Sequence, residues 1–219
     1  MLTTDADALA GWRVVRRQVD WAGAVPAGEY GPLRPATDGL AAWIAAQRVT
    51  RGAPRAERLL AAAESARADA ARGLPLTPEL LLGWQRLVLG DGELGFRRTD
   101  AFAKGGRERY GYAPSLRDDL AACLRESADP GLPLPARAAR AYLDVAFFHL
   151  FADGNGRCAM LVLCYVLELA GVRLDLVGPL AVARYPDDPA GAADLALLVS
   201  VLIRAARRRA DPGPDPHHR

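Results

Sequence analysis

Apolar residues recur along most of the chain at intervals of three and four positions, the spacing that places them on one face of an α-helix. This pattern, together with its Asp, Thr, Pro and Gly boundaries, predicts helices over residues 6–19, 40–51, 55–72, 78–89, 118–127, 138–148, 158–170 and 190–207. Two short runs, 101–104 and 108–112, are predicted strands joined by a turn at Gly105-Gly106. We therefore expect a mostly α-helical fold with one β-hairpin.

The segment before residue 36 combines a short amphipathic helix with a stretch rich in proline and glycine. The prolines and glycines between residues 26 and 35 exclude regular structure there. We expect Trp12, Trp21 and Tyr30 to hold this segment against the core. An aromatic-rich arm is also typical of a partner-binding surface, and the sequence leaves both interpretations open.

One stretch contains most of the candidate catalytic and ligand-binding residues and lies between two strongly apolar helical segments. It reads His149-Leu150-Phe151-Ala152-Asp153-Gly154-Asn155-Gly156-Arg157. Its two glycines allow positive φ and leave space above the backbone, so consecutive N–H groups can converge on an anion. The helix that follows directs the positive end of its dipole at the same point. Arg157 in the first turn adds a fork of donors, and the stretch therefore predicts a phosphate site.

Two further side chains of this stretch carry chemistry. His149 has a pKa suited to taking a proton from a hydroxyl near pH 7. Asp153 is a hard oxygen ligand of the kind that holds Mg²⁺ against a diphosphate. A base, a metal ligand and a phosphate site thus lie within nine residues.

The order of these residues resembles the signature of the Fic family, also called Fido, which reads His-Pro-Phe-x-Asp/Glu-Gly-Asn-Gly-Arg-x-x-Arg. The matching positions are His149, Phe151, Asp153, Gly154, Asn155, Gly156 and Arg157. Members of this family mostly transfer AMP from ATP to a protein hydroxyl. The resemblance implies a Fic-type helical bundle with a β-hairpin flap over the site, and it extends over about residues 72–171.

The resemblance also implies roles for the matching residues. His149 is the implied catalytic base, and Asp153 is the implied ligand of Mg²⁺. The residues implied to bind ATP or another nucleoside triphosphate are Phe151, Gly154, Asn155, Gly156 and Arg157. The implied partner is a protein with a target serine, threonine or tyrosine hydroxyl, and an antitoxin or a second copy of the chain are further candidate partners.

The predicted hairpin follows Gly95-Phe96-Arg97-Arg98-Thr99, which resembles the stretch that leads into the flap of Fic proteins. Such a flap aligns the target chain by pairing with it as an added strand. Lys104, the only lysine in the sequence, lies next to the predicted turn and is a candidate to bind the nucleotide phosphates or the target. A solvated hairpin tip is the alternative interpretation.

Two positions depart from the signature: Leu150 replaces its proline and Met160 its second arginine. In the family that arginine contacts the γ-phosphate, so from Met160 alone we expect weak ATP binding with little discrimination against ADP. The Doc branch of the family also lacks the arginine and transfers the γ-phosphate, whereas this chain keeps Gly-Asn-Gly. Such phosphotransfer is one alternative function, and a degenerate Fic fold that serves as a binding module is another.

In many Fic proteins a helix before the core carries Ser/Thr-x-x-x-Glu-Gly/Asn, whose glutamate pairs with the second arginine and blocks the γ-phosphate site. The nearest match here is Ser65-Ala66-Arg67-Ala68-Asp69-Ala70, which has a shorter acid and no glycine. An ordinary solvated helix face is the alternative interpretation of this segment.

The length of the chain limits how many cores it can form, and its charge balance limits the kinds of partner it can bind. With 219 residues, 51% of them hydrophobic, the chain can bury one good core. We expect a helical N-terminal extension packed on the core (1–72), a Fic core with its C-terminal helix (73–206) and a disordered tail (207–219). The 28 basic and 26 acidic residues nearly balance, which gives no electrostatic case for nucleic acid or an anionic membrane as a partner.

The cysteines, the N-terminal residues and the length of the apolar runs together predict the cellular compartment of the protein. Cys123, Cys158 and Cys164 lack metal-site spacing and are expected to be buried free thiols of a cytoplasmic protein. Asp5 and Asp7 argue against a signal peptide, and the sequence shows no apolar run of about 18 residues that would span a membrane.

Overall fold

The computed structural model describes residues 7–90 and 94–210, which form eight α-helices, two short 3₁₀ helices and one antiparallel sheet of two strands. The helices are α1 (Ala8–Gln18), α2 (Gly39–Arg51), α3 (Ala53–Ala71), α4 (Pro78–Leu89), α5 (Leu116–Arg125), η1 (Glu126–Ala128), α6 (Leu134–Phe148), α7 (Asn155–Leu169), η2 (Gly178–Leu180) and α8 (Pro189–Ala210). The strands are β1 (Ala101–Ala103) and β2 (Glu108–Tyr110), with Phe102 opposite Arg109. The expected mostly α-helical fold with one hairpin is confirmed.

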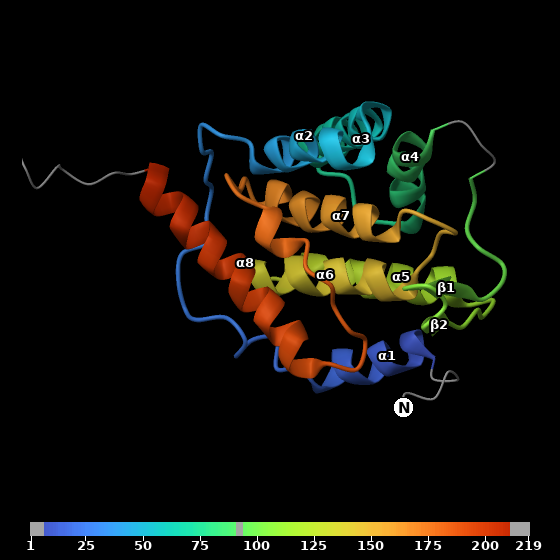
Figure 1. Ribbon diagram of the computed structural model, residues 1–219. Helices are drawn as coiled ribbons and strands as arrows, with labels where there is room; N and C mark the ends of the chain where they lie inside the picture. The colour runs from blue at the N-terminus through green and yellow to red at the C-terminus, as the bar shows by residue number, and fades with distance from the viewer. Residues whose placement is uncertain (1–6, 91–93, 211–219) are drawn as a thin grey trace, which may run out of the picture.

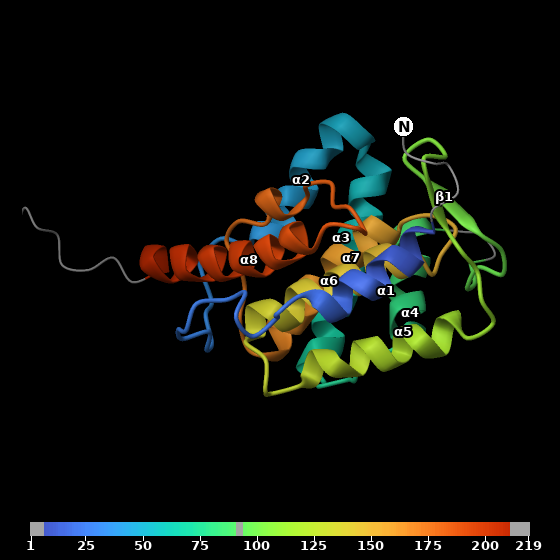
Figure 2. The same cartoon turned by 90° about the horizontal axis from the view of Figure 1, so that it is seen from below.

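Helices α6 and α7 form the centre of the molecule and pack against each other (Figure 1). On the far side of α7 lie α3 and α4, with α2 packed on α3, while α8 crosses α6 on the opposite side. Ten of the fifteen residues of α7 are buried, which explains why its sequence is apolar on nearly every face. The hairpin lies at one end of this bundle, beside the end of α6 that carries His149 (Figure 2).

The helix boundaries follow the predictions within four residues. The largest difference is at α6, which begins at Leu134 and not at residue 138. Helix α7 begins at Asn155, because Gly154 with φ 81° ends the preceding loop. Helix α8 continues through residue 207 to Ala210, so the predicted tail begins inside a helix, and residues 211–219 lie outside the described part of the chain. Within α4, Leu87 shares the spacing of the apolar residues Leu80, Leu81, Trp84 and Val88, which predicts a core position, but it is 40% exposed.

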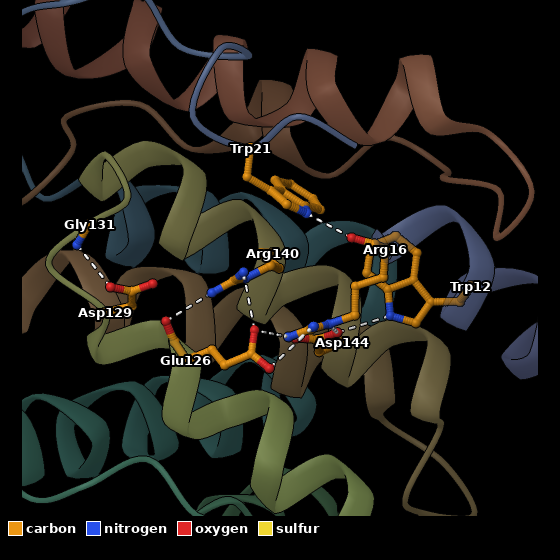
Figure 3. Close-up of polar contacts among 8 residues, drawn as sticks. All are labelled: Trp12, Arg16, Trp21, Glu126, Asp129, Gly131, Arg140 and Asp144. Atoms are coloured by element: carbon orange, nitrogen blue, oxygen red, sulfur yellow. Dashed lines mark hydrogen bonds and ion pairs between the residues drawn. The ribbon is translucent and has the colours of Figure 1, made fainter. Parts of the chain in front are cut away.

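An ion-pair network around the buried carboxylate of Asp144 fixes α1 to the core (Figure 3). The carboxylate of Asp144 on α6 accepts a hydrogen bond from Trp12 Nε1 at 3.0 Å and pairs with Arg16 Nε at 2.7 Å. Arg16 also pairs with Glu126 of η1 at 3.1 Å, and Glu126 pairs with Arg140 at 3.2 Å. Because Trp12 is fully buried in this network, packing on the core is the correct interpretation of the N-terminal aromatic segment.

Replacing Asp144 by alanine is expected to lower the free energy of unfolding by about 3 kcal/mol, because Arg16 would lose its closest counter-charge in a buried site. Urea denaturation followed by circular dichroism measures this change. The matched control is Asp119→Ala, whose partner Arg13 lies on the same helix but on the surface. That control should cost about 1 kcal/mol or less, and equal losses for both variants would contradict the prediction.

Helix α8 corrects one expectation from the sequence. It contains an 18-residue window that is apolar enough, by length and composition, to cross a membrane. The run was missed because Asp194 and several small residues interrupt its apolar appearance. In the structure 44% of that window is buried inside the molecule, where α8 packs against α6.

The three cysteines are free thiols, as expected, but they differ in exposure. Cys158 is buried, whereas Cys123 and Cys164 are half-buried. Burial raises the pKa of Cys123 to about 12, so its thiol stays protonated at neutral pH.

Candidate active site

The stretch from His149 to Arg157 borders a cleft of about 620 Å³. One side of this cleft is the loop after α6 together with the first turns of α7. The other residues around it are Trp43, Gln47 and Arg51 of α2, Arg55 of α3, Phe102 and Ala103 of β1, Tyr142 of α6, and the segment 181–183. A volume of this size can hold a nucleotide-sized ligand.

His149 terminates α6 in the left-handed region, with φ 50° and ψ 51°. Its Nδ1 lies 3.0 Å from the carbonyl oxygen of Ala146, which can only accept, so Nδ1 carries the proton and Nε2 keeps its lone pair. The ring stacks on Tyr110 of β2 at a centroid distance of 4.1 Å. Burial lowers the pKa of His149, although the hydrogen bond to Ala146 offsets part of this effect, so the ring stays neutral to a lower pH than an ordinary histidine.

Arg97 connects the hairpin to the loop between α6 and α7, residues 149–154, which we call the histidine loop. We did not predict this role. Its guanidinium donates to the carbonyl oxygens of His149 (2.7 Å), Thr99 (2.6 Å) and Gly111 (2.8 Å). Its backbone N–H donates to Leu150 at 3.0 Å. Burial lowers the pKa of Arg97, since its partners are carbonyl groups and not carboxylates. The only sequence signal was the resemblance of residues 95–99 to the stretch before a flap.

The loop between α6 and α7 is closed by the side chain of Asn155. Its Oδ1 accepts from Phe151 N at 3.0 Å, and its Nδ2 donates to Phe151 O at 2.7 Å. The ring of Phe151 is fully buried and stacks on Phe96. Phe151 and Asn155 were both expected to bind the nucleotide. In the structure the Phe151 ring packs in the core and does not border the cleft, whereas Asn155 borders the cleft while its amide holds the loop.

The two glycines of the motif both allow positive φ, but their conformations differ. Gly154 has φ 81°, and a Cβ there would collide with Gln85 of α4. Gln85 is buried and donates to the carbonyl oxygen of Asp153 at 2.5 Å, so α4 holds the loop in place. Gly156 lies in the first turn of α7 and faces open space, which leaves the N-terminus of that helix accessible.

Asp153 and Arg157 lie together at the start of α7. Asp153 Oδ1 accepts from Gly154 N at 2.5 Å, and its Oδ2 pairs with Arg157 Nη2 at 3.1 Å. The Asp153 side chain is 71% exposed, whereas that of Arg157 is 13% exposed. Burial lowers the pKa of Arg157, and the positive charge of Arg55 acts in the same direction. A carboxylate and a guanidinium therefore border the cleft at the helix N-terminus.

Lys104 is not brought into the cleft by the structure. Its ammonium pairs with Glu108 at 2.6 Å, donates to Arg184 O at 3.1 Å and lies 4.0 Å from the ring centre of Tyr185. These contacts fasten the hairpin to the segment before α8. Since Glu108 also accepts from the hydroxyl of Tyr110 at 2.6 Å, Lys104 lies in a chain of contacts that ends at the ring stacked on His149.

The segment Ser65–Ala70 lies far from the cleft. Asp69 is buried and accepts from Trp84 Nε1 at 2.6 Å, and it also pairs with Arg72. It follows Arg55, which borders the cleft, by fourteen positions, or about 21 Å along α3 at 1.5 Å per residue. The interpretation of this segment as a solvated helix face is therefore wrong for Asp69, and its resemblance to an inhibitory motif has no counterpart at the cleft.

Comparisons with known proteins agree with this architecture. Residues 75–167 match the family model described as the Fic/DOC family. The fold is similar to the crystal structure of a Fic domain containing signaling protein from Bacteroides thetaiotaomicron, with a TM-score of 0.54 and 19% sequence identity, over 75% of this chain and 77% of that one. At this identity the likeness concerns the fold alone. No curated protein matches the chain in sequence.

Proposed function

The chain carries a domain of the Fic/DOC family at residues 75–167, and from this premise we propose that it transfers a nucleoside monophosphate from a nucleoside triphosphate to a protein hydroxyl. The observation that carries the proposal is the placement of His149. Its Nε2 keeps a lone pair at a cleft that also contains the open N-terminus of α7 and Arg157. The proposed base and the proposed phosphate-binding groups thus border one cleft.

In the proposed reaction the oxygen of a serine, threonine or tyrosine side chain attacks the α-phosphorus, and the Nε2 of His149 takes the hydroxyl proton. A new oxygen–phosphorus bond forms while the bond from the α-phosphorus to the bridging oxygen breaks. Diphosphate leaves with the electron pair of that bond. The first N–H groups of α7 and the guanidinium of Arg157 stabilise the charge on the phosphates.

The residues at the cleft fit Mg²⁺ as an ion shared with the substrate. Among residues 7–90 and 94–210, no group of three or more His, Cys, Asp or Glu side chains could hold a metal by itself. Mg²⁺ typically binds through one or two carboxylates plus phosphate oxygens, and the exposed carboxylate of Asp153 supplies one. The ion would neutralise charge on the departing diphosphate.

The hairpin is the proposed docking site for the target protein. Phe102 of β1 is 62% exposed and borders the cleft, so a chain that pairs with this strand would pass the opening. An extended segment that adds as a strand gains backbone hydrogen bonds in register. Its hydroxyl side chain could then approach His149.

Met160 favours a second candidate reaction, transfer of the γ-phosphate. It borders the cleft and is 2% exposed, and its thioether offers no donor to an outer phosphate. Incubation of the protein with ATP labelled at either the α- or the γ-phosphate separates the reactions. Label on the target from α-labelled ATP alone supports the proposed function, label from γ-labelled ATP alone supports phosphotransfer, and no label from either rejects both.

The acid limb of kcat/KM is expected to lie below pH 6.5, the ordinary pKa of histidine, because burial lowers the pKa of His149. A base acts when it is neutral, and a lowered pKa keeps the imidazole of His149 neutral to a lower pH, so the acid limb shifts downward. Initial rates of label transfer across this range measure the limb. A limb above pH 6.5 would contradict the assigned cause of the shift.

A further inference from the structure

The cleft contains two arginines that the sequence motif did not indicate. Arg51 is the last residue of α2, and Arg55 lies in the first turn of α3, so both belong to the corner between these helices. Both border the cleft together with Arg157 and Met160. The positive charges of Arg55 and Arg51 contribute to lowering the pKa of Arg157, after the larger effect of burial, which places the three guanidinium groups in one electrostatic neighbourhood.

Among the described residues, Arg51 and Arg55 have no carboxylate partner, in contrast to Arg48 and Arg67 on the same two helices. Arg48 pairs with Glu57 at 3.0 Å, and Arg67 pairs with Asp38 at 2.5 Å. Within residues 7–90 and 94–210, neither Arg51 nor Arg55 forms an ion pair, and the buried Nε of Arg55 has no hydrogen-bond partner. Buried donors usually have a partner, so this arrangement favours an anion from outside the chain.

The position of Arg55 is electrostatically unfavourable in the free protein. It lies at the N-terminal end of α3, where the helix dipole is already positive, and the first turn of α3 contains no acidic residue. Arg157 lies correspondingly at the N-terminal end of α7. Two positive helix ends and three guanidinium groups therefore surround one cleft, with Asp153 the carboxylate that borders it. A polyanion would relieve this repulsion.

We propose that Arg51 and Arg55 bind the outer phosphates of the nucleoside triphosphate, in place of the arginine that position 160 lacks. The choice of a nucleotide as the polyanion rests on the proposed function. In this arrangement the start of α7 and Arg157 hold the inner phosphates, while the corner of α2 and α3 closes on the outermost one. The protein then prefers ATP to ADP, which reverses the expectation drawn from Met160 alone.

The test is calorimetric titration of MgATP, MgADP, AMP and inorganic tripolyphosphate against the wild type and the Arg51→Gln/Arg55→Gln double variant. We expect the double variant to weaken ATP binding by roughly tenfold to a hundredfold, the range for loss of charge-assisted hydrogen bonds, and to leave AMP within about threefold. Arg48→Gln is the matched control, because it removes the same charge from α2 outside the cleft. Its nucleotide affinities should equal those of the wild type.

The outcomes separate this inference from the proposed function. Equal affinity of the wild type for ATP and ADP, or an unchanged affinity of the double variant for ATP, would overturn the assignment of Arg51 and Arg55 whether or not label transfer occurs. An equal loss for AMP would overturn it as well, because AMP has no outer phosphate. Arginine-dependent binding of ATP and tripolyphosphate by a protein that transfers no label would support the inference and reject the function. Thermal melts of the variants exclude unfolding as the cause.

Discussion

Replacing His149 by asparagine is expected to lower the rate of group transfer by roughly 10²–10⁴-fold and to change nucleotide affinity by only a few fold. The imidazole acts on the attacking hydroxyl, so its loss removes proton transfer. The phosphates are held by other groups, the start of α7 and Arg157, which the substitution leaves in place. Single-turnover label transfer and calorimetry measure the two quantities separately.

Asparagine is the appropriate replacement because of the backbone at this position. His149 has φ 50°, a region that asparagine tolerates and that strains alanine. Tyr110→Phe is the matched control, since it keeps the ring that stacks on His149 and removes only the hydroxyl bonded to Glu108. We expect this control to transfer label within about threefold of the wild-type rate. Near-normal turnover of His149→Asn would remove this histidine from the mechanism.

Features encoded locally were predictable from the sequence. The spacing of apolar residues located the helices, and caps such as Asp38 marked where they begin; its side chain accepts from Ala41 N at 3.1 Å. The hairpin followed from two short runs around Gly105-Gly106. The stretch from His149 to Arg157 was found because base, carboxylate, glycines and arginine are neighbours in sequence as well as at the cleft.

Features that depend on contacts between distant segments were not predictable. Arg97 and Gln85 hold the histidine loop from positions 52 and 68 residues away, and nothing in their local sequence indicates those partners. Arg51 and Arg55 look like ordinary helix-end arginines until the packing of α3 on α7 brings them to the cleft. Phe151 shows the converse, since a match to a functional motif did not tell whether its ring faces a ligand or the core.

Replacing Asp153 by asparagine is expected to raise the Mg²⁺ concentration for half-maximal transfer on the order of tenfold, the effect of losing one charged oxygen ligand. Asparagine keeps an oxygen that can accept from Gly154 N, so the turn before α7 is retained. The substitution also releases Arg157 from its pair with Asp153. Without Mg²⁺, therefore, ATP should bind the variant as tightly as the wild type or more tightly.

A raised Mg²⁺ requirement together with an unchanged or higher affinity for ATP without Mg²⁺ distinguishes a metal ligand from a structural residue. A merely structural loss would weaken transfer and ATP binding together and leave the Mg²⁺ dependence unchanged. Asp100→Asn is the matched control, because its carboxylate pairs with Arg109 on the hairpin and does not border the cleft. Mg²⁺ titrations of the transfer rate, with ATP titrations in the presence of a chelator, give both quantities. An unchanged Mg²⁺ requirement in Asp153→Asn would assign Asp153 to holding the loop and Arg157, and another group would then have to bind the metal.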